Sequence, residues 1–220
     1  MTVQIITTAD GSHSLLNSDL DETYHSRHGA LQESAYVFIK MGFDFFLAQH
    51  KPKSINILEI GFGTGLNAWL TLQRARQTNI QVNYTSLETY PLDKSIWSNL
   101  NYAESDKQSF EQLHEAEWNK AVSIHKNFNL HKIEGSLQNA SLSTIHSHII
   151  YFDAFAPNKQ PEMWALPLLK KVCDTLLPGG VFVTYCAKGQ VKRDLKSLGL
   201  SVENLPGPPG KREMLRGLKL

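Results

Sequence analysis

Apolar positions along the chain follow two different periods, and they divide the sequence into two parts. Residues 3–17 alternate apolar and polar positions on either side of Asp10-Gly11, a dipeptide that favours tight turns, so this stretch predicts a β hairpin. A polar, irregular segment follows. Residues 30–50 then repeat apolar side chains at helical spacing, which predicts one long and mostly buried helix. We therefore expect residues 1–50 to form an N-terminal region made of a hairpin, a loop and a helix.

From Ile55 onward, short β-rich runs alternate with helical stretches, which predicts a parallel sheet with helices on both faces. The expected strands cover 55–61, 82–88, 128–135, 148–155 and 180–187, and the expected helices cover 65–77, 91–100, 106–119 and 167–177. Residues 201–220 give two further β-like pieces around a Pro/Gly turn, which indicates an antiparallel edge to the sheet. Residues 51–220 are therefore expected to form an α/β core.

Size and composition narrow the class of protein. A chain of 220 residues can bury one substantial core, and it contains no apolar run near the roughly 18 residues that a membrane span needs. The N-terminus lacks the basic and apolar segments of a signal peptide, so we expect a cytoplasmic location and no membrane contact. Cys173 and Cys186 have neither metal-site spacing nor a disulfide framework around them, and we expect two reduced packing residues.

Charge is unevenly placed along the chain, although the formal net charge is only +1. Eight basic and three acidic residues lie from Lys188 to the end, which leaves +5 in this segment and −4 in the rest. A basic C-terminal region could meet a polyanion, since each phosphate contact releases counterions. A solvated helix face with a few loop charges would give the same composition.

A glycine-rich turn follows the first strand of the expected core. The sequence "LEIGFGTGLN" at 58–67 places Gly61, Gly63 and Gly65 where small residues let the backbone approach a ligand and where the next helix directs its N–H groups toward it. A dinucleotide-binding turn would need glycine in place of Leu66. The spacing found here resembles motif I of class I S-adenosylmethionine-dependent methyltransferases.

The ends of the next two strands fit the same cofactor. Glu88 closes the strand over 82–88, where a ribose diol needs a bidentate acceptor. The third strand ends at Gly135-Ser136, where this fold commonly offers a polar group to the adenine amino group. The alternative to a cofactor site is that the glycines only turn the chain and that Glu88 is a surface acid. The residues expected to bind S-adenosylmethionine are Glu59, Gly61, Phe62, Gly63, Gly65, Glu88, Thr89, Gly135 and Ser136.

Asp153 ends the apolar run "HIIYF" and precedes a loop that contains Pro157 and Pro161. In an open parallel sheet, ligands bind beyond the carboxyl ends of the strands, and the end of this strand is expected to lie beside the glycine turn. A carboxylate there suits an amine nucleophile, because it can hold the amine, accept its proton and stabilise the positive charge that grows on nitrogen. Asp153 as a loop or helix cap is the alternative.

A longer set of motifs resembles one family. The stretches "YFDAFAPNKQPEMW" at 151–164 and "LEIGFGTGLN" at 58–67, together with "YHSRHGALQESAYVFI" at 24–39 and "GPPGKREM" at 207–214, resemble the methyltransferase domain of the MnmC family, including its stand-alone form, MnmD. The resemblance covers nearly the whole chain. It implies an α/β class I methyltransferase (Rossmann-like) fold, with a mainly parallel seven-stranded sheet, an antiparallel edge strand and a small N-terminal β appendage.

The resemblance also implies a reaction and a partner. The expected reaction is methylation, by S-adenosylmethionine, of the side-chain amine of 5-aminomethyl(-2-thio)uridine at the tRNA wobble position, with the tRNA anticodon loop as partner. It makes Asp153 the catalytic residue and places Tyr24, Glu33, Lys211 and Arg212 in the substrate site. The bifunctional relative also carries an FAD-dependent oxidase domain, for which this chain has neither the length nor a second glycine motif. We expect no FAD, no metal and no obligate protein partner.

Other functions fit parts of the same pattern. A small-molecule N-methyltransferase, or a relative of polyamine synthases, would also place an acid beside an amine. An RNA-binding module that has kept the fold without catalysis would tolerate Asp153→Asn. His25 and His28 lie three residues apart, but no third metal ligand accompanies them.

Overall fold

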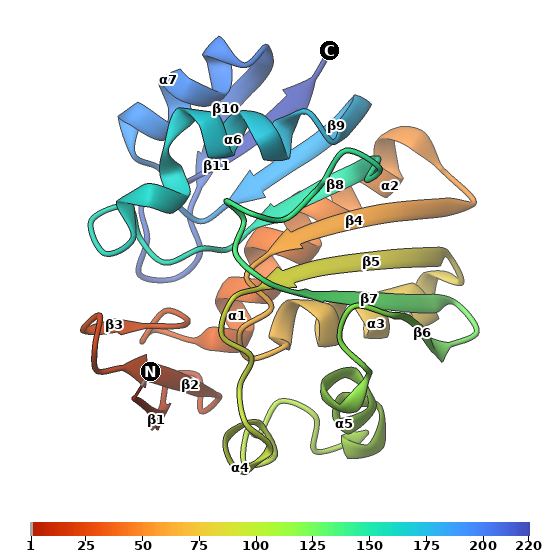
Figure 1. Cartoon of the computed structure of the whole chain (residues 1–220), viewed down its shortest axis with the longest axis vertical. Coiled ribbons are helices and arrows are strands. Elements are labelled where there is room, and N and C mark those ends of the chain that lie inside the picture. The colour runs from red at the N-terminus through yellow and green to blue at the C-terminus, as the bar shows by residue number, and fades with distance from the viewer. Residues whose placement is uncertain (1) are drawn as a thin grey trace.

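An eight-stranded mixed sheet forms the centre of the computed structural model, which describes residues 2–220 (Figure 1). Its order is β10-β11-β9-β8-β4-β5-β7-β6, and the five strands from β9 to β7 run parallel. Antiparallel pairing adds β11 and β10 at one edge and β6 at the other. The strands are β4 (Ser54–Ile60), β5 (Gln81–Glu88), β6 (Ala121–His125), β7 (Phe128–Glu134), β8 (Ser147–Phe152), β9 (Leu176–Thr184), β10 (Leu200–Pro206) and β11 (Glu213–Lys219).

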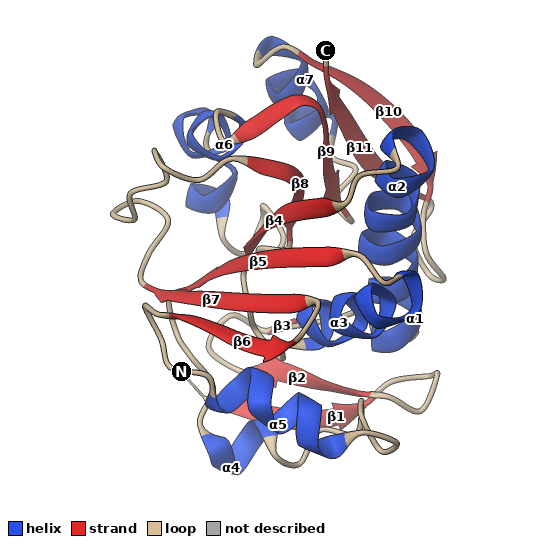
Figure 2. Ribbon diagram, turned by 90° about the vertical axis from the view of Figure 1, so that its right-hand side faces the viewer, coloured by secondary structure: helices blue, strands red, loops and turns tan. Residues whose placement is uncertain are grey.

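Helices cover both faces of this sheet (Figure 2). On one face lie α1 (Ala30–Ser34), η1 (Ala35–Asp44), α2 (Phe45–His50) and α3 (Leu66–Thr78), and on the other lie α6 (Leu166–Cys173) and α7 (Gly189–Ser197). Successive residues of a strand point to opposite faces, so Ile57 and Leu58 of β4 enter two separate apolar clusters. The remaining helices are α4 (Lys94–Trp97), α5 (Lys107–Glu115) and η2 (Pro161–Trp164). Within residues 2–220, no helix has both the length and the apolar character needed to cross a bilayer.

The N-terminal residues form a second, three-stranded antiparallel sheet of β1 (Val3–Thr7), β2 (His13–Asn17) and β3 (Glu22–Thr23). Asp10 fixes the β1–β2 turn to the start of α1, since its carboxylate accepts hydrogen bonds from the backbone N–H of Ser12 (3.0 Å) and of Gln32 (3.1 Å). Figure 1 shows this small sheet beside the ends of β4 and β5 that carry the arrowheads. It therefore stands next to the carboxyl edge of the parallel strands.

The structure confirms the hairpin, the parallel core and the antiparallel C-terminal edge. Residues 30–50 are helical throughout, but η1 in their middle is a π-helix, which the apolar spacing did not reveal. The sheet has eight strands instead of seven, since β6, none of whose residues is fully buried, adds an edge. The division of the chain at residue 50 stays a prediction.

Several element boundaries differ from the prediction, and the helix expected over 106–119 ends at Glu115. The helix expected over 91–100 is reduced to four residues in α4. The helix expected over 167–177 ends at Cys173, and β9 begins at Leu176, before Pro178-Gly179-Gly180, because a register shift between β8 and β9 takes up the glycines. The amphipathic helix α7 was not predicted as an element.

Candidate active site

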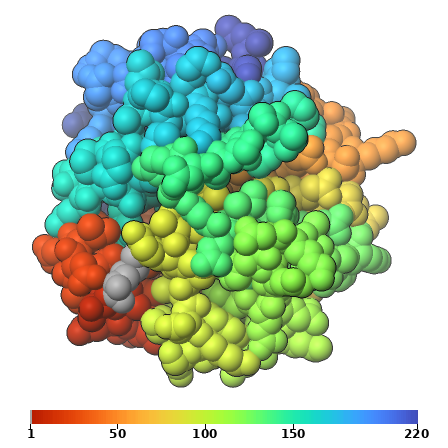
Figure 3. All heavy atoms as spheres, viewed as in Figure 1, coloured from red at the N-terminus to blue at the C-terminus, as the bar shows by residue number. Residues whose placement is uncertain are grey.

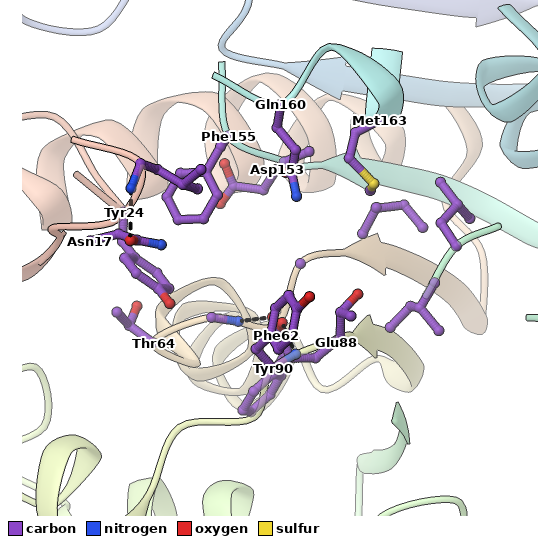
Figure 4. Close-up of a pocket in the computed structure, with 18 of the residues that line it drawn as sticks. Asn17, Tyr24, Phe62, Thr64, Glu88, Tyr90, Asp153, Phe155, Gln160 and Met163 are labelled. Atoms are coloured by element: carbon purple, nitrogen blue, oxygen red, sulfur yellow. Dashed lines mark hydrogen bonds between the residues drawn. The ribbon is translucent and has the colours of Figure 1, made fainter. Parts of the chain in front are cut away.

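A cavity of about 410 Å³ opens at the carboxyl edge of the parallel strands. Its walls come from the loops after β4, β5 and β8, from the N-terminal sheet and from the segment that leads into α6. The space-filling view shows N-terminal residues in red, the segment after β5 in yellow and the segment after β8 in green to cyan on one face (Figure 3). In close-up, Asp153, Gln160 and Met163 lie along one side of the cavity, and Thr64, Phe62 and Glu88 lie along the other (Figure 4).

The glycine turn forms one wall of the cavity, as its position after β4 predicts. Gly61, Gly63 and Gly65 have φ angles of 94°, 49° and 72°, a region that side chains with a Cβ rarely adopt. A Cβ on Gly61 would lie 2.8 Å from the carbonyl oxygen of Asp153. Glycine at this position therefore lets the turn pass directly beside the end of β8. Gly61, Phe62 and Gly63 line the cavity, whereas Gly65 lies against the ring of His114 and does not.

Glu88 ends β5 on the opposite side of the turn and lines the cavity. One carboxylate oxygen accepts a hydrogen bond from the backbone N–H of Gly63 (2.9 Å), and the other accepts one from the N–H of Tyr90 (2.8 Å). Each oxygen keeps a further lone pair, so the half-buried carboxylate can still accept from a ligand. Thr89 also lines the cavity. The acid predicted at this strand end is thus held rigidly against the glycine turn.

Two other residues predicted to bind the cofactor lie behind this wall. Gly135 donates its N–H to the carbonyl of Glu88 (2.8 Å), and Ser136 follows it, but neither residue lines the cavity. The next residue, Leu137, does line it and is 1% exposed. An apolar side chain is therefore what this strand end presents to the cavity. The sequence pattern did not predict Leu137 in the cavity wall, because this fold commonly places a polar group at the corresponding strand end.

Glu59 lies beneath the cavity and not in its wall. It is fully buried, and one carboxyl oxygen accepts a hydrogen bond from the hydroxyl of Ser86 (2.6 Å), while the other has no partner among residues 2–220. Burial raises the pKa of Glu59 to about 8, and the charge of nearby Asp153 adds to the rise. Its carboxyl group is therefore neutral at pH 7. Any role for Glu59 in cofactor binding stays a prediction.

Asp153 enters the cavity directly after β8. Its backbone N–H donates to the carbonyl of Ile60 (3.0 Å), and one carboxylate oxygen accepts a hydrogen bond from the side-chain amide of Asn67 (2.8 Å). Loss of solvation raises the pKa of Asp153 to about 7, and the charge of Glu33 adds to the rise, whereas Asn67 and Lys211 oppose it. The carboxyl group thus changes charge near neutral pH, as a group that exchanges protons with a substrate requires.

Two aromatic side chains close the cavity near Asp153. The rings of Tyr24 and Phe155 meet edge to face, with their centroids 5.0 Å apart, and both line the cavity. Tyr24 reaches the wall from the residue after β3, so the N-terminal sheet contributes directly to the site. Burial raises the pKa of Tyr24, and the charge of Glu88 adds to it, so its hydroxyl group stays protonated.

Glu33 and Lys211 lie behind the wall formed by Tyr185. The buried carboxylate of Glu33 accepts the backbone N–H of Ser26 (2.7 Å) and forms an ion pair with Lys211. The Lys211 ammonium group also lies 3.7 Å from the centre of the Tyr185 ring, which lines the cavity. These contacts tie the turn between β10 and β11 to the N-terminal region. Arg212, the next residue, is exposed and does not line the cavity.

Lys211→Met is expected to destabilise the protein, since it leaves the Glu33 carboxylate buried without its counter-charge. Because Lys211 is partly exposed, we expect a loss of about 1–3 kcal/mol in the free energy of unfolding, less than for a fully buried pair. Urea denaturation of the wild-type and Lys211→Met proteins measures this loss. A midpoint unchanged within error would show that the ion pair adds nothing to stability.

His25 has a structural partner in this site. Its Nε2 lies 2.7 Å from the Thr64 hydroxyl oxygen, and burial lowers its pKa to about 4, so the ring is neutral. His28 instead lies against Gly210 of the C-terminal turn. Over residues 2–220, no group of three or more His, Cys, Asp or Glu side chains could hold a metal ion.

Comparisons with known proteins identify the family and the fold of the chain. The family model described as S-adenosyl-L-methionine-dependent methyltransferase matches residues 103–220. The tRNA 5-methylaminomethyl-2-thiouridine biosynthesis bifunctional protein MnmC of Nitrosospira multiformis is 27% identical over 215 residues, which are 92% of this chain and 35% of that protein. The chain therefore spans about a third of the length of the curated relatives that it matches.

Solved structures show the same fold. MNMC2 from Aquifex aeolicus superposes with a TM-score of 0.84 at 25% identity and covers 98% of this chain and 70% of its own. DesVI from Streptomyces venezuelae shares the fold alone, with a TM-score of 0.53 at 12% identity over 86% of this chain and 93% of its own. The chain has the class I methyltransferase fold that the glycine turn predicts, with a small N-terminal antiparallel sheet.

Proposed function

Because the chain belongs to the family of S-adenosyl-L-methionine-dependent methyltransferases, we propose that it methylates the side-chain amine of 5-aminomethyl(-2-thio)uridine at the tRNA wobble position. The product would be 5-methylaminomethyl(-2-thio)uridine, and its MnmC relatives are named for the biosynthesis of the 2-thio form of this nucleoside. The observation that carries this proposal is the Asp153 carboxyl group, which lines the same cavity as the glycine turn and Glu88. The reaction is that of the stand-alone form, MnmD, in which the amine is supplied to the methyltransferase already exposed.

The cavity fits S-adenosylmethionine. The turn over 61–63 brings backbone close to the cavity, Glu88 keeps acceptor capacity for a ribose diol, and the buried Leu137 offers an apolar contact to a planar base. When bound, this cofactor supplies a methyl group that is open to attack by a nucleophile. The residues proposed to hold it are Gly61, Phe62, Gly63, Glu88, Thr89 and Leu137.

Asp153 is proposed to bind the amine and to take up its proton. An amine attacks only through its free electron pair, so an ammonium group must lose a proton before the nitrogen–methyl bond forms and the sulfur–carbon bond breaks. The methylated nitrogen then carries the positive charge and can lose a second proton. The carboxylate can accept this proton directly or through a water molecule, and it stabilises the positive charge on nitrogen. Tyr24 and Phe155 would hold the uracil ring close to Asp153, since aromatic side chains stack on unpaired bases.

The rate of methyl transfer should rise with pH through about pH 7. The pKa of Asp153 is raised to about 7, so the group is protonated below this value and cannot accept a proton there. We expect kcat/KM to fall about tenfold per pH unit on the acid side, because only the charged fraction is active. Initial rates between pH 5.5 and 8.5 measure it. A profile that is flat from pH 5.5 to 7 would contradict this role.

The basic C-terminal turn offers a contact for the phosphates of tRNA. Lys211 is engaged with Glu33 and Tyr185, so Arg212, which is exposed, is the better candidate of the two. We expect Arg212→Gln to weaken tRNA binding and to lower the slope of log K against log salt by about one. Lys53→Gln, at the amino end of β4 and so at the opposite edge of the sheet, is the control. Equal slopes of log K against log salt for Arg212→Gln and Lys53→Gln would place the tRNA-binding surface elsewhere.

A small amine is the alternative substrate, and one observation favours it. Asp19, Glu88 and Glu162 line the cavity together with Asp153, so the site would attract an ammonium group and repel a phosphate. An RNA-binding module without catalysis is the second alternative, and it requires that Asp153→Asn leave function intact. The aminomethyl group of a wobble uridine could satisfy the same acidic cavity, with the tRNA phosphates kept outside it.

Transfer of labelled methyl from S-adenosylmethionine to bulk tRNA tests the proposal. The tRNA comes from cells that lack this protein, and the product is digested to nucleosides and separated. We expect the label in a 5-methylaminomethyluridine derivative. No incorporation into tRNA, with cofactor binding confirmed by calorimetry, would reject the tRNA substrate and leave small amines as the next candidates.

A further inference from the structure

Asn67 is the residue of α3 that touches the proposed catalytic carboxylate. It is the second residue of the helix, is 3% exposed and lines the cavity. Its side-chain nitrogen donates to a carboxylate oxygen of Asp153 over 2.8 Å. A carboxylate only accepts hydrogen bonds, so the NH₂ group of Asn67 must be the part that faces it. This contact spans 86 positions of sequence and joins the helix after the glycine turn to the end of β8.

Packing does not explain an amide at this position. The side-chain oxygen of Asn67 is buried without a hydrogen-bond partner among residues 2–220. Burying a polar atom in this way costs roughly 1–3 kcal/mol, and a leucine has nearly the same shape without that cost. Within residues 2–220, the Asn67 side-chain nitrogen donates to Asp153, the carboxyl group that lines the cavity. The hydrogen bond to the Asp153 carboxyl group is therefore what favours an asparagine at position 67.

Asn67 also stands next to a second carboxyl group. Its side chain interacts with the buried Glu59 as well as with Asp153, and both interactions favour the charged form of the acid. Burial raises the pKa of both carboxyl groups, and the charge of Asp153 raises that of Glu59 further, so Glu59 does not carry a charge easily beside a charged Asp153. A donor fixed beside Asp153 favours charge on the carboxyl group that faces the cavity.

We propose that Asn67 is a positioning residue, whose amide fixes the rotation of the Asp153 carboxylate and leaves its second oxygen free to receive the substrate amine. This inference rests on the proposed role of Asp153 as the group that binds the amine. A carboxylate that turns freely would present either oxygen at any angle, and misplacing a reacting group lowers the rate even when the ligands still bind. Asn67 would thus act on turnover through Asp153 and would not contact the methyl group itself.

Asn67→Leu tests the proposal by separating stability from turnover. We expect an unchanged or higher melting temperature, because the unsatisfied oxygen is removed, and a KM for S-adenosylmethionine within about threefold of wild type. We expect kcat to fall by about tenfold or more, and the midpoint of the pH–rate profile to move to higher pH. Thr71→Val, one turn further along α3 and fully buried, is the matched control, with kcat and midpoint near wild type.

The pKa of Asp153 in the protein without ligand gives a second readout that needs no substrate. Carboxyl ¹³C NMR of labelled aspartate, assigned with Asp153→Asn, should show this pKa raised in Asn67→Leu and unchanged in Thr71→Val. A wild-type kcat or an unshifted Asp153 pKa in Asn67→Leu would overturn the proposal. If wild-type protein transfers no methyl to tRNA, the proposed function fails, whereas the Asp153 pKa still tests the effect of Asn67.

Discussion

Asp153→Ala is expected to lower kcat for methyl transfer by a factor on the order of 100 or more, while S-adenosylmethionine binds within a few-fold of wild type. The substitution removes the proposed acceptor for the amine proton and the negative charge beside the nitrogen. It leaves the glycine turn and Glu88 in place, since Asp153 meets the turn through its backbone N–H and carbonyl. Single-turnover rates with saturating tRNA, together with calorimetric cofactor titration, measure the two effects separately.

Asp153→Asn is the matched variant, because it keeps the shape of the side chain and removes its charge and basicity. Both variants should lose the rise in rate near pH 7. Turnover within about threefold of wild type in Asp153→Asn would remove Asp153 from the chemistry, since a general base of this kind contributes roughly 10²–10⁴-fold. Loss of cofactor binding together with turnover would instead make Asp153 part of the cofactor site.

Glu88→Ala is expected to weaken S-adenosylmethionine binding by a factor of about 10–100, since hydrogen bonds to a charged acceptor are worth roughly 1.5–3 kcal/mol. The variant loses the proposed acceptor for the ribose diol, and it also frees the N–H of Gly63, which Glu88 now holds. Calorimetry with S-adenosylmethionine and with the demethylated product would measure the change in Kd, and circular dichroism would check the fold.

Glu134→Ala is the control for this prediction. Glu134 is exposed and ends β7 directly beside Glu88 in the sheet register, so it carries the same charge at the same edge without lining the cavity. We expect its cofactor Kd to equal that of wild type within error. A Glu88→Ala protein that binds the cofactor as tightly as Glu134→Ala would assign Glu88 to the structure of the turn alone.

Much of the site was accessible from sequence because the carboxyl ends of parallel strands share one edge of a sheet. The glycine turn after β4, Glu88 after β5 and Asp153 after β8 each follow an apolar run, and the pairing of β4 with both β5 and β8 brings the three strand ends together. The same reasoning placed Ser136 at the next strand end. There the chain turns so that Leu137 faces the cavity instead, a detail that depends on the loop conformation and not on the strand pattern.

The remaining features depend on contacts between distant segments. Asn67 looks like an ordinary polar residue in the first turn of a helix, and only its approach to Asp153 distinguishes it. Lys211 belongs to a run of basic residues that indicates a nucleic-acid surface, yet the fold of the C-terminal turn pairs its ammonium group with Glu33 and places it against the Tyr185 ring. Charge along a sequence does not say which cations are already paired.

The measurement that tests the central claim most directly compares two synthetic anticodon stem-loops that differ only at the wobble position. One carries 5-aminomethyluridine and the other carries uridine, and each is incubated with the protein and S-adenosylmethionine before mass spectrometry. We predict that the aminomethyl RNA gains the mass of one methyl group in place of hydrogen, that the uridine RNA gains none, and that Asp153→Asn abolishes the gain. An aminomethyl RNA of unchanged mass, under conditions where the wild-type protein binds the cofactor, would contradict the account.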